Sequence, residues 1–296
     1  MSTGYSIAYI ERSTGISRET LRIWERRYGF PRPDRDANGD RSYSEADLER
    51  LRVIKRLLDS GHRPGRIVPT GTVLLPEAAD LEGAERAEGG SSFGDFLALL
   101  RTAAPEEALD WLRRRMRGRS LEDFTTRTLA PLTRTVGDAW AAGRLCVHEE
   151  HLYTEMVGRL LRGAIDALPK GGGAPVLLAT LPEERHGLGL LMAEAVMRAA
   201  GARCLNLGVD IPIPEILGAV ARHEAAALAL SFSPAYPRRR IGPQLEALRQ
   251  ALPEACGLWV GGLGVARLRP MPGVRFCLEL EEAPRLLAEL APAEMG

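Results

Sequence analysis

Hydrophobic residues change their spacing along the 296-residue chain, and the changes divide it into segments. Residues 1–68 are polar and rich in arginine, whereas residues 69–92 show no sustained period and end in Gly-Gly-Ser-Ser, as linkers do. In residues 93–168, hydrophobic residues recur every three or four positions, which predicts amphipathic helices. We therefore expect an N-terminal domain over 1–68, a linker over 69–92 and a four-helix bundle over 93–168.

The C-terminal part, residues 175–296, follows a different pattern. Short hydrophobic runs lie at 176–180, 204–208, 227–233, 257–262 and 275–280, separated by helical stretches at 187–200, 214–224, 241–252 and 282–290. Uninterrupted hydrophobic strands that alternate with helices predict a parallel sheet covered on both faces. The fold class is thus multidomain α and α/β, ending in a doubly wound, Rossmann-like domain whose ligands would bind at the carboxyl ends of the strands.

Composition narrows the functional classes only slightly. The formal net charge is zero, so the total charge does not indicate a nucleic-acid or membrane partner. No stretch of 18 apolar residues and no signal-like N-terminus occurs, so we expect a cytoplasmic protein with no membrane partner. The cysteines form no C-x-x-C pair and indicate neither a zinc site nor a disulfide framework; they are Cys146, Cys204, Cys256 and Cys277.

The N-terminal 68 residues carry 14 Lys and Arg against 10 Asp and Glu, a local positive excess in a neutral chain. The pattern predicts one helix, a turn at Gly15 and a second helix capped by Ser17. A loop with prolines and a glycine follows, and then a third helix that opens with a capping box from Ser44 to Asp47. A helix-turn-helix with a basic wing suits duplex DNA, although the arginines alone would also fit a solvated helix face.

This segment reads S-x-E-T-L-R-x-W-E-R-R-Y-G-F-P-x-P, then G-x-R-x-Y, then S-E-A-D-L, and it resembles the winged helix-turn-helix domain of the MerR family of transcription regulators. The resemblance implies contacts to double-stranded operator DNA from six residues. They are Arg18, Thr20 and Arg22 on the second helix, with Arg35, Arg41 and Tyr43 in the wing. Asp40 stands where family members often have histidine, and its carboxylate would repel phosphate.

The loop after the first predicted strand contains the pattern E-x-H-x-x-G, formed by Glu184, His186 and Gly189. Forty-one residues separate Gly189 from Ser231, and 27 residues separate Ser233 from the glycine pair at 261–262. Taken alone, a loop histidine is usually a hydrogen-bonded surface residue. The three elements at the ends of predicted strands one, three and four resemble the signature of cobalamin-binding domains, D-x-H-x-x-G, S-x-L and G-G.

This second resemblance implies a role for each matched residue. His186 would ligate cobalt in place of the cofactor's dimethylbenzimidazole, and Glu184 would accept a hydrogen bond from its other ring nitrogen. The nucleotide tail would lie in space left by Gly189, Gly261 and Gly262, with Ser231 hydrogen-bonding in its slot. The chain departs from the signature twice: Glu184 replaces the commoner aspartate, and Ser233 replaces leucine, which makes that wall of the tail pocket more polar.

In the helical segment, nine residues separate Trp140 from Glu150 and His151. An aromatic and two polar residues on helices are more often core and surface. The pattern W-x9-E-H before a cobalamin domain nevertheless resembles light-sensing repressors of the CarH and LitR type. The resemblance implies that these three residues contact the 5′-deoxyadenosyl group of adenosylcobalamin, that a DNA-binding homotetramer forms in the dark, and that light releases the operator of carotenoid or photoprotection genes.

Well-studied members of that group carry a histidine directly after the tryptophan, and it coordinates cobalt after photolysis. Here that position is Ala141, so the substitute would have to be His148, His151, Cys146 or water. This departure and Ser233 keep a second interpretation open, a light-independent regulator that senses cobalamin or redox state. Two further alternatives are a corrinoid enzyme or shuttle and a domain that only oligomerises. The fused DNA-binding segment argues against an enzyme, and Glu184, His186 and the glycine pair argue against loss of the cofactor.

Overall fold

The computed structural model describes residues 4–36, 39–59, 64–68, 92–102 and 104–290, so nearly all of the expected linker at 69–92 lies outside the described residues. The chain divides into two compact units. One comprises Met1–Gly89 and Asp138–Arg144, and the other comprises Gly90–Gly137 and Leu145–Gly296. The domain boundaries expected from the sequence stay predictions, but the elements expected within them can be compared directly.

The N-terminal unit begins with the predicted helix-turn-helix. Helices α1 (Ile7–Thr14) and α2 (Arg18–Tyr28) are joined through Gly15, which adopts the left-handed conformation with φ 69°. Ser17 caps α2 as predicted, because its side chain accepts a hydrogen bond from the Thr20 backbone N–H at 3.2 Å. Gly15 is suited to this turn because it has no Cβ to clash at positive φ.

The wing is a three-stranded antiparallel sheet of β1 (Tyr5–Ser6), β3 (Arg41–Tyr43) and β2 (Asp34–Arg35), in that spatial order. The predicted capping box from Ser44 to Asp47 starts α3 (Glu45–Asp59), which is followed by α4 (Pro64–Ile67). The helix-turn-helix and α3 share one hydrophobic core. It buries Ile10, Ile16, Leu21 and Trp24 from the helix-turn-helix together with Leu48, Leu51 and Ile54 from α3.

Four helical stretches are present in the described part of residues 92–168, as expected. They are α5 (Phe93–Arg101), α6 (Pro105–Met116), a long third stretch and α9 (Val147–Asp166). The third stretch runs from α7 (Leu121–Phe124) through a π-helical segment (Thr125–Leu129) into α8 (Ala130–Ala141). Aromatic contacts of Phe96 with Trp111 and with Tyr153 join α5 to α6 and α9.

The C-terminal sheet has five parallel strands in the order β5-β4-β6-β7-β8. All five match the predicted strands: β4 (Gly172–Ala179), β5 (Ala202–Gly208), β6 (Ala227–Ser231), β7 (Gly257–Gly261) and β8 (Val274–Cys277). The four predicted helices between and after them are α10 (Leu188–Ala199), α11 (Ile213–His223), α12 (Arg238–Ala251) and α13 (Ala283–Leu290), the last preceded by a 3-10 turn at Leu280–Glu282. The doubly wound α/β fold is therefore confirmed.

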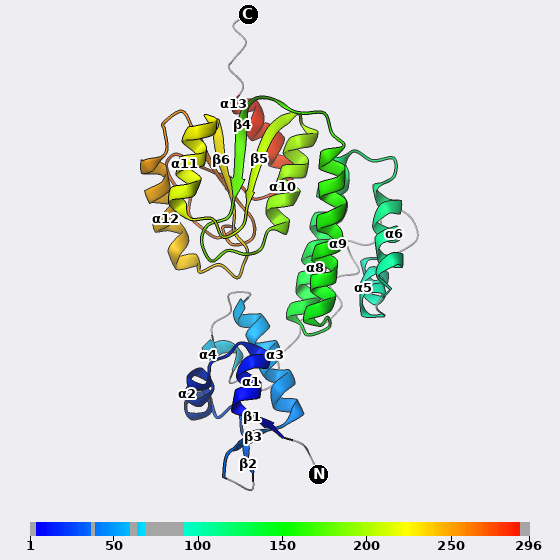
Figure 1. Cartoon of the computed structure of the whole chain (residues 1–296), viewed down its shortest axis with the longest axis vertical. Helices are drawn as coiled ribbons and strands as arrows, with labels where there is room; N and C mark the ends of the chain where they lie inside the picture. Colours follow the sequence, from blue (N-terminus) through cyan, green and yellow to red (C-terminus); the bar gives the residue numbers. More distant parts are fainter. Residues whose placement is uncertain (1–3, 37–38, 60–63, 69–91, 103, 291–296) are drawn as a thin grey trace, which may run out of the picture. The chain divides into compact units, whose positions relative to one another are not determined.

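Alternation along β4 assigns the helices to the two faces of the sheet (Figure 1). Leu177 and Ala179 join the core formed with α11 and α12, whereas Val176 and Leu178 join the core formed with α10 and α13. Helix α9 packs along α10, so the helical segment lies against the α10 layer. The strand order reverses between β4 and β6, and ligands of such sheets bind in the crevice outside the carboxyl ends of the strands at this point.

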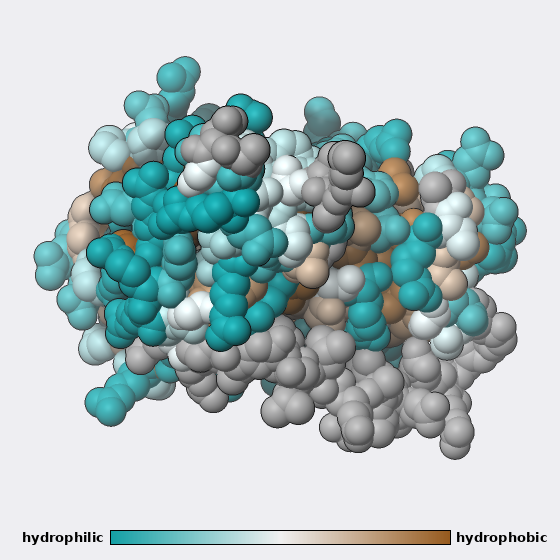
Figure 2. Space-filling model, turned by 90° about the horizontal axis from the view of Figure 1, so that it is seen from below, coloured by the Kyte–Doolittle hydropathy of each residue, from teal (hydrophilic) through white to brown (hydrophobic). Residues whose placement is uncertain are grey.

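The surface is mainly polar on the face drawn in Figure 2, where hydrophobic residues occupy small areas between hydrophilic ones. In the described part of the chain, no helix combines the length and the apolar character needed to cross a bilayer.

Candidate functional site

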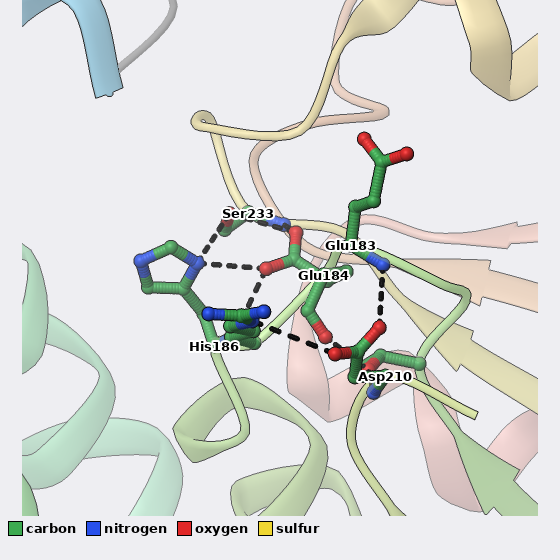
Figure 3. A network of polar contacts seen from close by, with 7 residues as sticks. Glu183, Glu184, His186, Asp210 and Ser233 are labelled. Atoms are coloured by element: carbon green, nitrogen blue, oxygen red, sulfur yellow. Dashed lines mark hydrogen bonds and ion pairs between the residues drawn. The ribbon is translucent and has the colours of Figure 1, made fainter.

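The loop between β4 and α10 carries the histidine of the E-x-H-x-x-G pattern (Figure 3). The Glu184 side chain is buried, and its Oε1 accepts hydrogen bonds from the His186 backbone N–H at 3.0 Å and from ring Nδ1 at 2.7 Å. An ionised carboxylate can only accept, so Nδ1 is the donor and Nε2 lies on the opposite edge of the ring. The His186 side chain is 63% exposed. The imidazole is thus oriented by its bond to Glu184 and lies at the carboxyl edge of the sheet.

Ser233, in the loop after β6, completes this arrangement. Its backbone N–H and its hydroxyl both lie 2.8 Å from Glu184 Oε2 and donate to it, and the hydroxyl oxygen lies 3.1 Å from His186 Nδ1. From the sequence we expect Ser233 to make a wall of the tail pocket more polar. Its hydroxyl donates to the Glu184 carboxylate, which lies beside the Nδ1 edge of the imidazole (Figure 3), so the departure from S-x-L adds a donor to the support of the histidine.

The protonation of Glu184 follows from two opposing effects. Burial raises the pKa of the Glu184 carboxyl, but hydrogen bonds from His186 and Ser233 to the ionised form outweigh burial and leave the pKa below its ordinary value. The carboxylate therefore stays ionised near neutral pH and keeps its capacity to accept from both partners.

The glycines of the pattern are required by the close approach of the protein's own loops. A Cβ built at Gly262, which has φ 88°, would lie 2.4 Å from the carbonyl oxygen of Phe232, and one at Gly261 would lie 2.9 Å from that of Cys277. A Cβ at Gly189 would lie 3.1 Å from Ser231 Oγ, so the first two sequence elements are in contact. The space that these glycines leave for a nucleotide tail stays a prediction.

Sequence reasoning missed three residues that shape these loops. A Cβ at Gly264 would lie 2.5 Å from the carbonyl oxygen of Ser233. Thr180 and Asp210 join the loop after β4 to the loop after β5 through side-chain hydrogen bonds. Asp210 had a signal in the sequence, since it is a carboxylate just beyond the carboxyl end of a strand, the position where ligand-binding loops lie.

The helical residues of the W-x9-E-H pattern are divided between the two units. Glu150 and His151 lie on α9, where the Glu150 carboxylate contacts His151 Nδ1 at 3.0 Å and accepts from the Thr154 hydroxyl at 2.8 Å. Trp140 falls in Asp138–Arg144, which belongs to the N-terminal unit, and its indole Nε1 is buried without a hydrogen-bond partner among the described residues. The joint role of the three side chains stays a prediction.

The residues expected to contact DNA from the second helix lie near the start of α2 or on its exposed surface. Arg18 Nε forms an ion pair with Glu11 Oε2 at 2.6 Å, and the Thr20 hydroxyl lies 2.8 Å from that of Ser17. Arg22 is exposed, one turn after Arg18. The hydrogen bonds of Arg18 and Thr20 within the helix-turn-helix fix these side chains near the N-terminus of α2.

In the wing, one expectation is corrected. Tyr43 lies in β3, but its side chain is 1% exposed and packs in the core of the N-terminal unit, so it cannot reach DNA. Arg35 is exposed and donates to the Gly39 carbonyl oxygen at 2.7 Å. Arg41 forms a two-point contact with Glu25 on α2, at 3.0 and 3.4 Å, which raises the pKa of its guanidinium despite partial burial. Arg41 therefore links the wing to α2.

Comparison with known proteins agrees with this architecture. The model of the MerR HTH family regulatory proteins matches residues 5–68, and a B12 binding domain model matches residues 95–162. The chain is 32% identical over 268 residues to the HTH-type transcriptional repressor CarH of Myxococcus xanthus, covering 87% of this chain and 88% of CarH. It is 33% identical over 261 residues to CarA of the same organism, covering 87% of this chain and 86% of CarA.

A likeness in fold extends to a corrinoid protein. The monomethylamine corrinoid protein of Methanosarcina barkeri superposes with a TM-score of 0.50 at 14% identity, covering 66% of this chain and 96% of that structure. The fold and the family matches together define the class, a MerR-type DNA-binding transcription regulator with a cobalamin-binding region. The chain belongs to the family of HTH-type transcriptional repressors that includes CarH and CarA.

Proposed function

We propose that this protein is a cobalamin-dependent, light-responsive transcription repressor that uses adenosylcobalamin as its chromophore and acts on double-stranded operator DNA. The observation that carries the proposal is the presentation of His186. Its imidazole is largely exposed at the carboxyl edge of the sheet, while Nδ1 is held by the buried carboxylate of Glu184. The family membership and the position of the site at the topological switch point support it.

The donor set fits a cobalt ion held in a corrin ring. A single imidazole with one free ring nitrogen would supply one protein ligand, which suits a metal that is already held by a macrocycle. The carboxylate on the far ring nitrogen fixes the tautomer and makes Nε2 the more basic ligand. Among the described residues, the buried Nε1 of Trp140 has no hydrogen-bond partner, and an acceptor on the adenosyl group would supply one.

Each predicted residue has a place in this proposal. His186 would hold the lower face through Nε2, and Glu184 and Ser233 would keep the ring oriented. The nucleotide arm would be accommodated by Gly189, Ser231, Gly261 and Gly262, and the adenosyl group by Trp140, Glu150 and His151. Bound adenosylcobalamin supplies a cobalt–carbon bond that light cleaves. The residues of the chain would orient the imidazole ring of His186 and donate hydrogen bonds at fixed positions.

We propose that binding of adenosylcobalamin controls the formation of the homotetramer and thereby DNA binding. A cofactor that binds one assembly state more tightly stabilises that state by mass action. In the dark the stabilised state would be a homotetramer that binds the operator, and light would lower its stability and release the DNA. The exposed arginines of α2 would supply contacts to the major groove. The protein would act in the cytoplasm and would catalyse no reaction.

Ala141 distinguishes this chain within the proposal. A methyl side chain cannot coordinate cobalt, so a photoproduct with a second imidazole at this position cannot form. The second ligand would come from His148, His151 or Cys146, or water would take the site. We therefore expect a photoproduct that reverts or decays differently from one with two imidazole ligands.

A second candidate function also rests on Ala141. Without a second histidine to capture cobalt after photolysis, the site could report cobalamin supply or redox state in a light-independent way. A corrinoid enzyme or shuttle is less well supported, because the relatives that the chain matches over most of its length are transcriptional repressors and the likeness to a corrinoid protein is one of fold.

One experiment separates these functions. The purified protein is loaded with adenosylcobalamin in the dark, and absorption, molecular size and operator binding are recorded before and after green light. The proposal expects a change in all three. Unchanged size and operator affinity after photolysis would favour the light-independent regulator. Absence of bound corrinoid in the dark would overturn both sensory functions.

A further inference from the structure

The loop that carries His186 is fastened to a second loop, which follows the neighbouring strand β5. Thr180, at the start of the first loop, is fully buried, and its backbone N–H donates to the Gly208 carbonyl oxygen at 3.1 Å. Its own carbonyl oxygen accepts from the Ile211 backbone N–H, also at 3.1 Å. The pairing of β4 with β5 therefore continues beyond the ends of both strands, toward the residues that support the histidine.

Asp210 is the central residue of this connection (Figure 3). Its Oδ1 accepts from the Glu183 backbone N–H at 2.7 Å. Its own N–H lies 2.9 Å from the Thr180 hydroxyl and 3.1 Å from the Glu184 carbonyl oxygen. The Thr180 hydroxyl donates to that same Glu184 carbonyl oxygen at 2.6 Å. We call these contacts of Thr180 and Asp210 with Glu183 and Glu184 the loop clamp.

The loop clamp stabilises two unfavourable backbone conformations. Glu183 has φ 73° and Asp210 has φ 58°, a region that residues other than glycine rarely adopt. Such conformations persist only where the surrounding structure holds them. Here each residue's N–H is bound by a group of the opposite loop, so the two conformations support each other. Among the described residues, the other non-glycine residue at positive φ is Glu224, which ends α11.

The conformation of Glu183 decides where the Glu184 carboxylate lies. Loss of the acceptor at Asp210 would leave the Glu183 N–H without its bond and allow φ to return to negative values. A change of φ by tens of degrees at position 183 displaces the next side chain, which is the one beneath His186. We propose that Asp210 is a positioning residue for His186, acting through Glu183 and Glu184. The inference deepens the proposed function and rests on His186 being the axial ligand.

For this role, the negative charge of Asp210 is less important than its acceptor oxygen and its tolerance of positive φ. Its other oxygen, Oδ2, lies 3.5 Å from Arg185 Nε, but the Arg185 side chain is 81% exposed, and ion pairs in water contribute little. What the loop clamp needs is an acceptor oxygen and a residue that tolerates positive φ. Asparagine has both, glycine tolerates positive φ but has no acceptor, and alanine has neither.

The test compares Asp210→Asn, Asp210→Gly and Asp210→Ala by titration with aquacobalamin, with the absorption bands of the bound pigment as the readout. We expect Asp210→Asn to resemble the wild type. Asp210→Gly and Asp210→Ala should weaken uptake by about tenfold and shift the spectrum toward that of His186→Ala. Glu224→Ala serves as the matched control, because it strains a positive-φ residue away from the loop and should leave the spectrum unchanged.

A double-mutant comparison with His186→Ala distinguishes a positioning role of Asp210 from a general loss of structure. In a His186→Ala background, Asp210→Gly should cause no further loss of uptake, because the side chain it positions is already absent. An equal loss in both backgrounds, or a wild-type spectrum in Asp210→Gly, would overturn the proposal.

A readout on the cofactor-free protein keeps this inference separate from the proposed function. Amide hydrogen exchange over residues 181–189 should be faster in Asp210→Gly than in the wild type, and unchanged in Asp210→Asn. Unchanged exchange in Asp210→Gly would refute the loop clamp even if the wild type binds cobalamin. Failure of the wild type to bind any corrinoid, with the exchange difference present, would refute the proposed function and the ligand role of His186 while leaving the loop clamp intact.

Discussion

The Oε1 atom of Glu184 lies 2.7 Å from Nδ1 of His186, and the carboxylate that makes this contact is 1% exposed. A buried carboxylate beneath an exposed imidazole determines which ring nitrogen can bind a ligand. Most of the functional predictions for this protein follow from that pair.

Glu184→Gln should weaken cobalamin uptake by roughly 10- to 100-fold, as loss of a hydrogen-bond partner of a metal-bound histidine does elsewhere. An amide cannot accept on both sides, so either His186 or Ser233 loses its bond. Affinity is measured by titration with aquacobalamin. Glu224→Gln, an exposed change outside this loop, is the control and should leave affinity within a factor of about two to three. Equal affinities of Glu184→Gln and wild type would contradict the orienting role.

Stability of the cofactor-free protein should depend on pH through Glu184. Burial raises the pKa of Glu184, but the hydrogen bonds from His186 and Ser233 together lower it by more than burial raises it. The pKa in the folded protein therefore lies below the pKa in the unfolded protein. A group of this kind contributes stability above its unfolded pKa, about 4.3, and the contribution is lost as pH falls through the folded pKa. The difference in thermal midpoint between wild type and Glu184→Gln should therefore shrink in acid. A difference that stays constant from neutral pH down to about pH 3 would exclude this linkage.

Ser233→Ala should weaken cobalamin uptake because it removes one of the donors to Glu184 and keeps the backbone N–H. The expected cost is about 1 kcal/mol, or roughly fivefold in affinity, since a hydrogen bond to a charged group is lost but water can replace part of it. Ser233→Thr retains the hydroxyl and is the matched control. If Ser233→Leu, which restores the residue of the S-x-L signature, bound cobalamin as tightly as the wild type, the hydroxyl would have no role in the support of His186.

Tyr43→Phe should leave operator affinity unchanged, because the side chain is buried and its hydroxyl oxygen has no partner among the described residues. Arg22→Ala should lower operator affinity, and if the guanidinium contacts a phosphate, the slope of log affinity against log salt should fall by about one. Both are measured by titration of labelled operator DNA at several salt concentrations. If Tyr43→Phe strongly lowered operator affinity while stability was unchanged, the Tyr43 hydroxyl would have to contact DNA.

Ala141→His should change the photoproduct of the adenosylcobalamin-loaded protein, by supplying an imidazole where the proposal places the upper face of the cofactor. We expect a stable bis-imidazole absorption spectrum after green light in this variant and its absence in the wild type. A wild-type protein that already gives such a spectrum would point to His148 or His151 as the second ligand. The spectrum would then be lost in His148→Ala or His151→Ala, and survival in both variants would contradict this assignment.

Much of the architecture could be predicted because local rules act over short distances. The capping box from Ser44 to Asp47 and the left-handed turn at Gly15 depend on neighbouring residues only. The five strands could be recognised because a sheet covered on both faces needs nearly continuous hydrophobic runs. The pairing of Glu184 with His186 could also be predicted from the sequence, because the two residues are two positions apart in one loop.

What could not be predicted depends on contacts between distant segments. Tyr43 belongs to a three-residue strand, too short for alternation to show which side chains face the core. Ser233 reaches Glu184 from 49 positions away, through a turn after β6 that no local pattern specifies. The need for glycine at position 262 comes from the Phe232 carbonyl oxygen on another loop, which is known only once β6 and β7 are paired.

Helix α10 begins two residues after His186, and it is buried on one side by the sheet and flanked on the other by α9. The loop that supports the imidazole thus continues without interruption into a stiff rod shared by two layers of the molecule. A displacement of the His186 ring would therefore rotate α10 slightly, and α9 would shift because it packs against α10. If His186 binds cobalt as proposed, α10 therefore connects that contact directly to α9.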